Sequence, residues 1–220
     1  IPGADPALVE KLTALEALLL PALMPVAGPN IYVRSTGSDE NGNGNMDKPF
    51  ASLAKAVDVA KNGDTIELMD DLSSTKYAFI SGKEITINGN GHSITRDDNF
   101  AAHNDQGRGG YHPAMIEVAN GAKLTLNNIT LNDGLKTEGT DFLEQTTGDS
   151  KNNENKVQDA IIAAYDGGGT IILGDKAVLK NFGGMSAVRV GGRPGAESTS
   201  TLIMKSGSMI TDDNPSRRGG

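Results

Sequence analysis

The sequence predicts an all-β protein folded as a parallel β-helix, a solenoid of stacked coils, with an N-terminal α-helix and a short capping helix. Three observations predict this fold class: strand-sized segments recur in groups of three, turn residues separate them, and the composition favours turns. Of the 220 residues, 28 are glycine, only 4% are aromatic and none is tryptophan. Such a composition, combined with short β-branched runs, is typical of many short strands joined by tight turns.

Four groups of three strand-sized segments repeat along the chain. The groups are 77–80, 84–87 and 92–95; 115–118, 123–126 and 129–131; 161–164, 170–173 and 177–179; and 187–190, 201–204 and 209–211. A parallel β-helix requires three short strands per coil, whereas an antiparallel sandwich requires hairpins with more uniform turn spacing. We therefore expect aligned, inward-facing stacks made by Ile85, Ile87, Leu124, Leu126, Ile171 and Leu173.

The grouping divides the chain into three predicted parts. These are an N-terminal helical segment (1–30), a first strand with its loop and capping helix (31–64), and the β-helix itself (65–220). No capping helix follows the last group of strands, so we expect the coil to be incomplete at its C-terminal end. An uncapped coil exposes unpaired strand edges. Further β-helix rungs or a second chain are therefore expected to cover that end.

The N-terminal segment has the start and stop signals of an α-helix. Asp5 is placed as the N-cap, Pro6 at the first helical position and Pro21 as the stop. Its leucine-rich face predicts packing on the domain that follows or on another molecule. The apolar run 14–27 is interrupted by a glutamate and two prolines and is too short to cross a bilayer, so we expect no membrane span.

The segment that follows has a distinctive order of elements. A strand at Ile31–Arg34 leads into an Asn/Gly loop, and Pro49 opens an amphipathic helix that the Asn62-Gly63 pair caps with a positive φ. In this order, over residues 31–68, the chain resembles the opening of bacterial right-handed parallel β-helix surface proteins of the pectate-lyase-like superfamily. The resemblance implies a right-handed coil whose open end is shielded by the short helix.

The loop before this helix also fits the start of a calcium-binding loop. Asp39, Asn41, Asn43 and Gly44 match D-x-[DN]-x-[DN]-G, but the twelfth position, where calcium needs a bidentate glutamate, is Phe50. Asn and Gly also form positive-φ turns. We expect a turn loop and no cofactor, with a calcium ion on Asp39, Asn41 and Asn43 as the alternative.

Two long insertions, 96–113 and 132–159, both leave after the third strand of a group and return to the first strand of the next. They should therefore emerge along one edge of the coil, where recognition is expected. A third, shorter excursion follows the first strand of the last group. In the first insertion, an aromatic face for stacking and charged groups for hydrogen bonds suit sugar hydroxyls. The candidate ligand-binding residues are Asp98, Asp105, Arg108, Tyr111 and His112, and the alternative is a solvated polar loop.

Asp212 and Asp213, directly after the last predicted strand, are the candidate catalytic residues. Glycoside hydrolysis needs two carboxyl groups roughly 5 to 9.5 Å apart, a spacing that stacked rungs can provide. Adjacent aspartates after a strand also form turns. No serine-hydrolase elbow, phosphate-binding loop, zinc-protease motif or dinucleotide fingerprint is present.

Charge and cysteine content exclude several classes of function. The formal net charge is −8 and the basic residues are scattered, which argues against a nucleic-acid partner. The chain has no cysteine, so disulfides, thiolate metal sites and cysteine nucleophiles are excluded. The resemblance implies either an extracellular or cell-surface module for carbohydrate or surface-protein recognition, adhesion or assembly, or part of a glycosidase or polysaccharide lyase. We favour the recognition module, because the resemblance transfers no catalytic residue to this chain.

Overall fold

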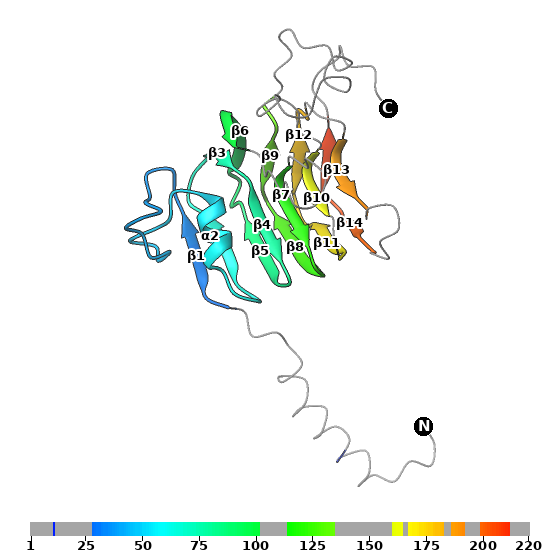
Figure 1. Ribbon diagram of the computed structural model, residues 1–220, viewed down its shortest axis with the longest axis horizontal. Coiled ribbons are helices and arrows are strands. Elements are labelled where there is room, and N and C mark those ends of the chain that lie inside the picture. Colours follow the sequence, from blue (N-terminus) through cyan, green and yellow to red (C-terminus); the bar gives the residue numbers. More distant parts are fainter. Residues whose placement is uncertain are drawn as a thin grey trace.

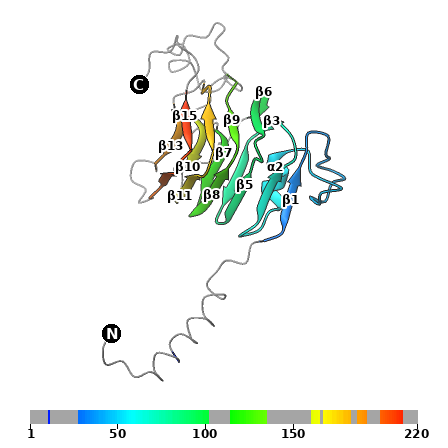
Figure 2. The ribbon, with the colours of Figure 1, turned by 180° about the vertical axis from the view of Figure 1, so that it is seen from behind.

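The computed structural model describes residues 11, 28–101, 114–134, 160–164, 167–182, 186–191 and 199–211. In this part of the chain, three parallel β-sheets surround one hydrophobic core, and a single short helix, α2 (Leu53–Val59), lies beside the first strands (Figures 1 and 2). The predicted N-terminal helix and most of the two long insertions lie outside the described residues. Within them, no helix has the length and apolar content needed to cross a bilayer.

Within the described residues the strands form three separate sheets, and every pairing between named strands is parallel. The six-stranded sheet has the order β1 (Asn30–Val33), β2 (Thr65–Leu68), β5 (Glu84–Asn88), β8 (Ala122–Asn127), β11 (Gly169–Leu173) and β14 (Thr201–Met204). The five-stranded sheet has the order β15 (Met209–Thr211), β12 (Val178–Lys180), β9 (Thr130–Asn132), β6 (Ser93–Ala101) and β3 (Leu72–Lys76). The four-stranded sheet has the order β13 (Ser186–Val190), β10 (Ala160–Ala164), β7 (Ala114–Ala119) and β4 (Ala78–Ser81).

From β2 onward the chain visits the three sheets in a fixed rotation. β2, β3 and β4 belong to the six-, five- and four-stranded sheets, and the same order then repeats through β15. All twelve strands of the four predicted groups are present, as is the predicted first strand (β1), and the equivalent members of each group fall in the same sheet. The all-β class and the grouping into threes are therefore confirmed.

The core consists of apolar side chains stacked from strand to strand. Ile85, Leu124 and Ile171 are paired in register across β5, β8 and β11, and Ile87, Leu126 and Leu173 form the next row. All six side chains are buried. The predicted inward-facing stacks are confirmed, since alternate residues of a strand face one side of its sheet.

One corner of the coil has left-handed backbone in three successive coils. Asn90, Asn128 and Lys176 all have positive φ at the connection from the six-stranded to the five-stranded sheet. Asparagine tolerates this conformation better than most residues. Just before this corner, Asn127 donates its side-chain N–H to Asn88 Oδ1 of the neighbouring coil (3.2 Å), so the amide side chains also link the coils.

Helix α2 begins and ends differently from the prediction. It starts at Leu53, not at Pro49, because Ser52 is the N-cap and its hydroxyl accepts a hydrogen bond from the Lys55 N–H. The C-cap is Ala60 with extended backbone, so the predicted Asn62-Gly63 cap is wrong. The Lys83 ammonium, in the turn between β4 and β5, donates to the carbonyl oxygens of Val57 and Ala60 and thereby satisfies the helix end.

Strand β3 was not predicted, and β6 is longer than predicted. In β3 only Leu72 is buried, so the sequence lacks an apolar pattern. Pairing with β6 forms the strand instead, as the register Leu72 with Ile94 and Lys76 with Ala101 indicates. The first predicted insertion therefore begins inside β6, and the strand continues to Ala101.

Candidate functional site

The loop between β1 and α2 is held tightly by its own backbone. Residues 38–50 form a series of hydrogen bonds, including Ser38 N–H to Pro49 O (3.1 Å) and Gly44 N–H to Lys48 O (3.1 Å). Gly44 has a φ of +81°, and a Cβ on Gly42 would collide with the carbonyl oxygens of Ser38 and Pro49. The glycines are therefore required by close backbone contacts, as expected for a turn loop.

Asp39 joins this loop to the start of α2. Its Oδ1 accepts hydrogen bonds from the backbone N–H groups of Ala51 (2.8 Å) and Ser52 (3.0 Å), and its Oδ2 accepts from the Ser52 hydroxyl (2.6 Å). Of the other two calcium candidates, Asn43 accepts a hydrogen bond from the Asn45 N–H, and Asn41 is exposed. The Asp39 carboxylate is thus engaged with the helix start.

Replacing Asp39 by alanine should therefore destabilise the protein without any involvement of calcium. Loss of a carboxylate that accepts three hydrogen bonds at a helix N-terminus should cost about 1–3 kcal/mol. Thermal unfolding of wild type and Asp39→Ala, each with and without calcium, measures this cost, and calcium should leave both midpoints unchanged. A large calcium-dependent rise in the wild-type midpoint that Asp39→Ala abolishes would establish the metal site instead.

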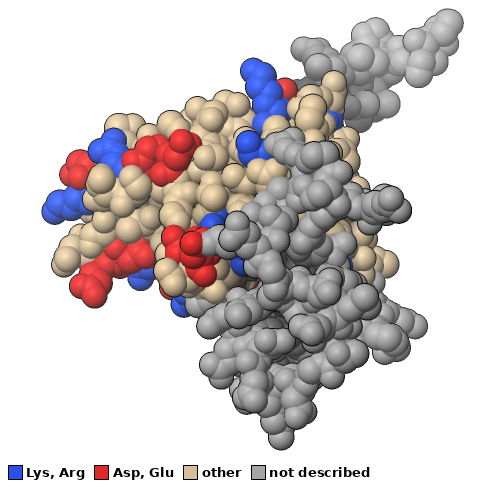
Figure 3. Space-filling model, turned by 90° about the horizontal axis from the view of Figure 1, so that it is seen from above, with Lys and Arg blue, Asp and Glu red and all other residues tan. Residues whose placement is uncertain are grey.

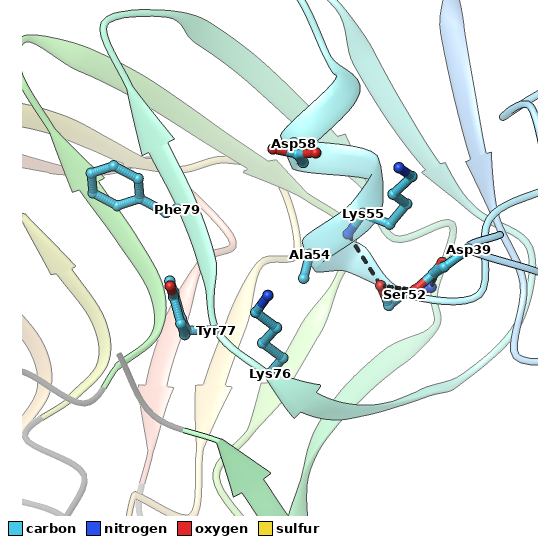
Figure 4. Close-up of a pocket in the computed structure, with 8 residues that line it drawn as sticks. All are labelled: Asp39, Ser52, Ala54, Lys55, Asp58, Lys76, Tyr77 and Phe79. Atoms are coloured by element: carbon cyan, nitrogen blue, oxygen red, sulfur yellow. Dashed lines mark hydrogen bonds between the residues drawn. The ribbon is translucent and has the colours of Figure 1, made fainter. Parts of the chain in front are cut away.

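Between α2 and the start of β4, the surface has an open hollow of about 410 Å³. The loop and helix contribute Asp39, Ser52, Ala54, Lys55 and Asp58, and the strand side contributes Lys76, Tyr77 and Phe79. Figure 4 shows Ala54, Lys55 and Asp58 on α2 and Lys76, Tyr77 and Phe79 along the neighbouring strand segment, with the Asp39–Ser52–Lys55 hydrogen bonds at the helix start. This hollow is the candidate functional site.

Two aromatic side chains give the hollow its apolar surface. The neighbours Ala78 and Ile80 are buried in the core, so Tyr77 and Phe79 lie on the outer side of the sheet. Phe79 is 38% exposed. An exposed phenylalanine is notable in a chain with so few aromatic residues, because part of its apolar surface stays in contact with water.

The charged groups of the hollow are mixed in sign. The Lys76 ammonium lies 5.8 Å from the centre of the Tyr77 ring, and the Lys55 ammonium lies 5.9 Å from the centre of the Phe50 ring. Asp39 is turned towards the helix start, whereas Asp58 is exposed. Figure 3 likewise shows basic and acidic side chains in small interspersed groups on the described face. The hollow therefore offers both hydrogen-bond donors and acceptors beside the aromatic rings.

The predicted site residues are only partly brought together. Asp39 lines the hollow, Asn41 and Asn43 lie in the adjoining loop, and Asp98 is exposed on β6. The remaining candidates, namely Asp105, Arg108, Tyr111, His112, Asp212 and Asp213, lie outside the described residues. In the described ranges, no three histidine, aspartate or glutamate side chains are grouped as metal ligands.

Sequence reasoning missed the strand side of the hollow, although a signal was present. The segment Tyr77–Ile80 was predicted as a strand, and alternate residues of a strand face the same side of the sheet, so its two aromatic residues share one face. That pairing of rings could have been inferred before the structure. The position of α2 beside β4 could not have been inferred from the sequence, because it depends on the path of the whole first coil.

Comparison of the chain with protein-family models, curated proteins and solved structures gave no match.

Proposed function

We propose that this chain is an extracellular recognition module of the bacterial cell surface, built on a right-handed parallel β-helix of the pectate-lyase-like kind, which binds carbohydrate in the hollow between α2 and β4. The observation that carries the proposal is the exposed Phe79 ring, next to Tyr77 and flanked by charged side chains. Sugars present apolar C–H faces together with hydroxyl groups, so they suit rings beside donors and acceptors.

The β-helix part of the proposal is supported by the rotation of the chain through three parallel sheets and by the aligned core stacks. Connections between parallel strands of one sheet are right-handed in about 98% of cases, which favours the right hand here. Helix α2 buries Leu53, Ala56 and Val57 beside β4 and β1, as a capping helix of a solenoid would.

The position of the hollow supports a recognition role. Lys76 and Tyr77 lie at the connection from the five-stranded to the four-stranded sheet, and Lys76 pairs with Ala101. The chain leaves the same corner again after β6 and after β9, where the two long insertions are. Both insertions therefore follow strands, β6 and β9, that stack one after the other beside β3, which leads into the hollow. Long connections along one edge of a solenoid usually carry the binding site.

The test is binding of the purified chain to an oligosaccharide array, with Phe79→Ala and Tyr77→Ala as variants. Each substitution should weaken binding at least about tenfold, which is the effect of losing about 1.4 kcal/mol of stacking. Ile203→Ala is the matched control, since Ile203 is 40% exposed on β14, a strand that does not line the hollow. Phe79→Ala and Ile203→Ala should keep the wild-type melting curve, whereas Tyr77→Ala should lower the melting midpoint, because Tyr77 is half-buried and packs against the core. Phe79→Ala therefore decides the test.

Three outcomes would overturn the proposal. Binding that survives both aromatic substitutions would remove the hollow as the site. Absence of binding on the array, together with capture of a surface protein, would favour a protein partner. Turnover of a bound oligosaccharide would favour the glycosidase or lyase alternative.

A further inference from the structure

The chain contains six Asn-Gly dipeptides, and all six lie in the described residues. Asparagine followed by glycine is chemically labile, because the glycine nitrogen can attack the asparagine side-chain carbonyl carbon. The attack needs a glycine nitrogen that is free to deprotonate and a carboxamide that is free to turn. In every one of the six dipeptides, the glycine N–H donates a hydrogen bond to a backbone carbonyl oxygen. The dipeptides differ in which part of the structure must open before the glycine N–H is released from its hydrogen bond.

Four of the dipeptides are held by contacts between coils. Their glycine N–H groups donate across to a neighbouring coil: Gly63 to Glu84, Gly89 to Asn127, Gly91 to Asn128, and Gly121 to Gly168. Their asparagine side chains are hydrogen-bonded as well. Asn62 accepts from the Glu84 N–H, whereas Asn88 and Asn90 donate to the Glu67 carboxylate and Asn120 donates to the Ser81 hydroxyl. Releasing any of these glycines requires neighbouring coils to separate, which is a costly opening.

The other two dipeptides belong to the loop before α2, where the bonds are local. Gly44 N–H donates to Lys48 O, and the Asn43 side chain accepts from the Asn45 N–H. Gly42 N–H donates to Ser38 O at 2.9 Å, within a single turn. Asn41 is exposed, and no hydrogen bond to its carboxamide is present within the described residues.

We propose that Asn41-Gly42 is the modification site of the folded protein, where asparagine is converted to aspartate and isoaspartate while the four coil dipeptides are protected. The Gly42 nitrogen forms a bond to Asn41 Cγ and loses its proton, and the side-chain nitrogen leaves as ammonia. Water then opens the cyclic imide at one of its two carbonyl carbons, giving aspartate or isoaspartate. No oxidant or reductant is needed.

The modification alters the candidate site, because this loop is tightly packed. A Cβ on Gly42 already has no room beside the Ser38 and Pro49 carbonyl oxygens. Isoaspartate adds a carbon to the main chain at this point, so the turn must shift. Asp39 lies two residues earlier and would be drawn from the start of α2, where it lines the hollow.

The test incubates the intact folded chain at mildly alkaline pH and 37 °C and follows each Asn-Gly peptide by mass spectrometry, with isoaspartate measured separately. In the folded chain, Asn41 should convert at least about tenfold faster than any of the four coil asparagines, because only a local opening exposes it. In urea, the six sites should convert at similar rates. Asn41→Gln should leave its peptide unmodified and the melting curve unchanged, and Asn43→Gln should leave conversion of Asn41 intact.

A second measurement follows the consequence for the loop. Hydrogen exchange of the Ala51 and Ser52 amides should speed up in the isoaspartate form, because both donate to Asp39. The proposal fails if a coil asparagine keeps pace with Asn41 in the folded chain. It also fails if Asn41 converts in urea but not in the folded chain, or if amide exchange is the same in both forms.

Discussion

Replacing Leu126 by alanine is expected to lower the free energy of unfolding by about 2–5 kcal/mol. Leu126 is fully buried and lies in register between Ile87 of the preceding coil and Leu173 of the following one. Removing its side chain loses apolar burial and leaves a cavity with rigid strands on both sides, which cannot collapse far. Urea unfolding followed by circular dichroism measures the change in midpoint.

Two control substitutions separate this effect from a general loss of side chains. Thr125→Ala changes the neighbouring, partly exposed residue on the outer face, and should cost about 0.5 kcal/mol or less. Met204→Ala changes the next position of the same row, paired with Leu173, but Met204 is 48% exposed. Its cost should therefore be well below that of Leu126→Ala. Equal costs for all three variants would contradict the assignment of this row as the core.

The coil was predictable because its signal repeats. Short apolar segments such as those at Leu124 and Ile171 alternate with period two, and the turns between them are marked by Asn and Gly. Each coil supports the prediction of the next, since strands of one sheet must share an inward face. The predicted strands and the six inward-facing residues were correct for this reason.

The elements that failed depend on contacts with other coils. β3 is formed by pairing with β6 and not by its own pattern, since Leu72 is its one buried residue. The end of α2 is satisfied by Lys83, a residue from the later turn between β4 and β5, so the local Asn62-Gly63 signal was misleading. Sequence patterns report local preference, and these features are decided by distant partners.

The candidate site was only partly predictable for the same reason. The loop of Asp39 was predicted as a turn loop, with a calcium ion on Asp39 as the alternative, and in the structure the Asp39 carboxylate accepts hydrogen bonds from the backbone at the start of α2. The sequence shows that Asp39 lies in the loop, but not that its partners are Ala51 and Ser52, twelve and thirteen residues away. The aromatic pair Tyr77 and Phe79 becomes a site only because α2 lies opposite.

A second large effect is expected at the ion pair between β6 and the end of β9. Arg96 Nε lies 2.9 Å from Asp133 Oδ1 and 3.3 Å from the Asp133 carbonyl oxygen. The Asp133 side chain is 1% exposed, whereas that of Arg96 is 18% exposed. In this ion pair the Asp133 carboxylate is therefore buried, whereas the Arg96 guanidinium is partly exposed to water. It also joins neighbouring coils at the residues where the two long insertions begin.

Because the two partners differ in burial, removing each should have a different cost. Arg96→Met keeps most of the apolar stem but removes the 2.9 Å ion pair from the buried Asp133 carboxylate, and should cost about 3–5 kcal/mol. Asp133→Asn leaves Arg96 uncompensated, but this side chain can turn towards water, so its cost should be smaller. Urea unfolding of both variants and of the double variant gives the coupling energy between them. If the double variant is as unstable as the sum of the two single variants, the charges do not interact, and the roots of the insertions are held by the strand pairing of β6 with β9 alone.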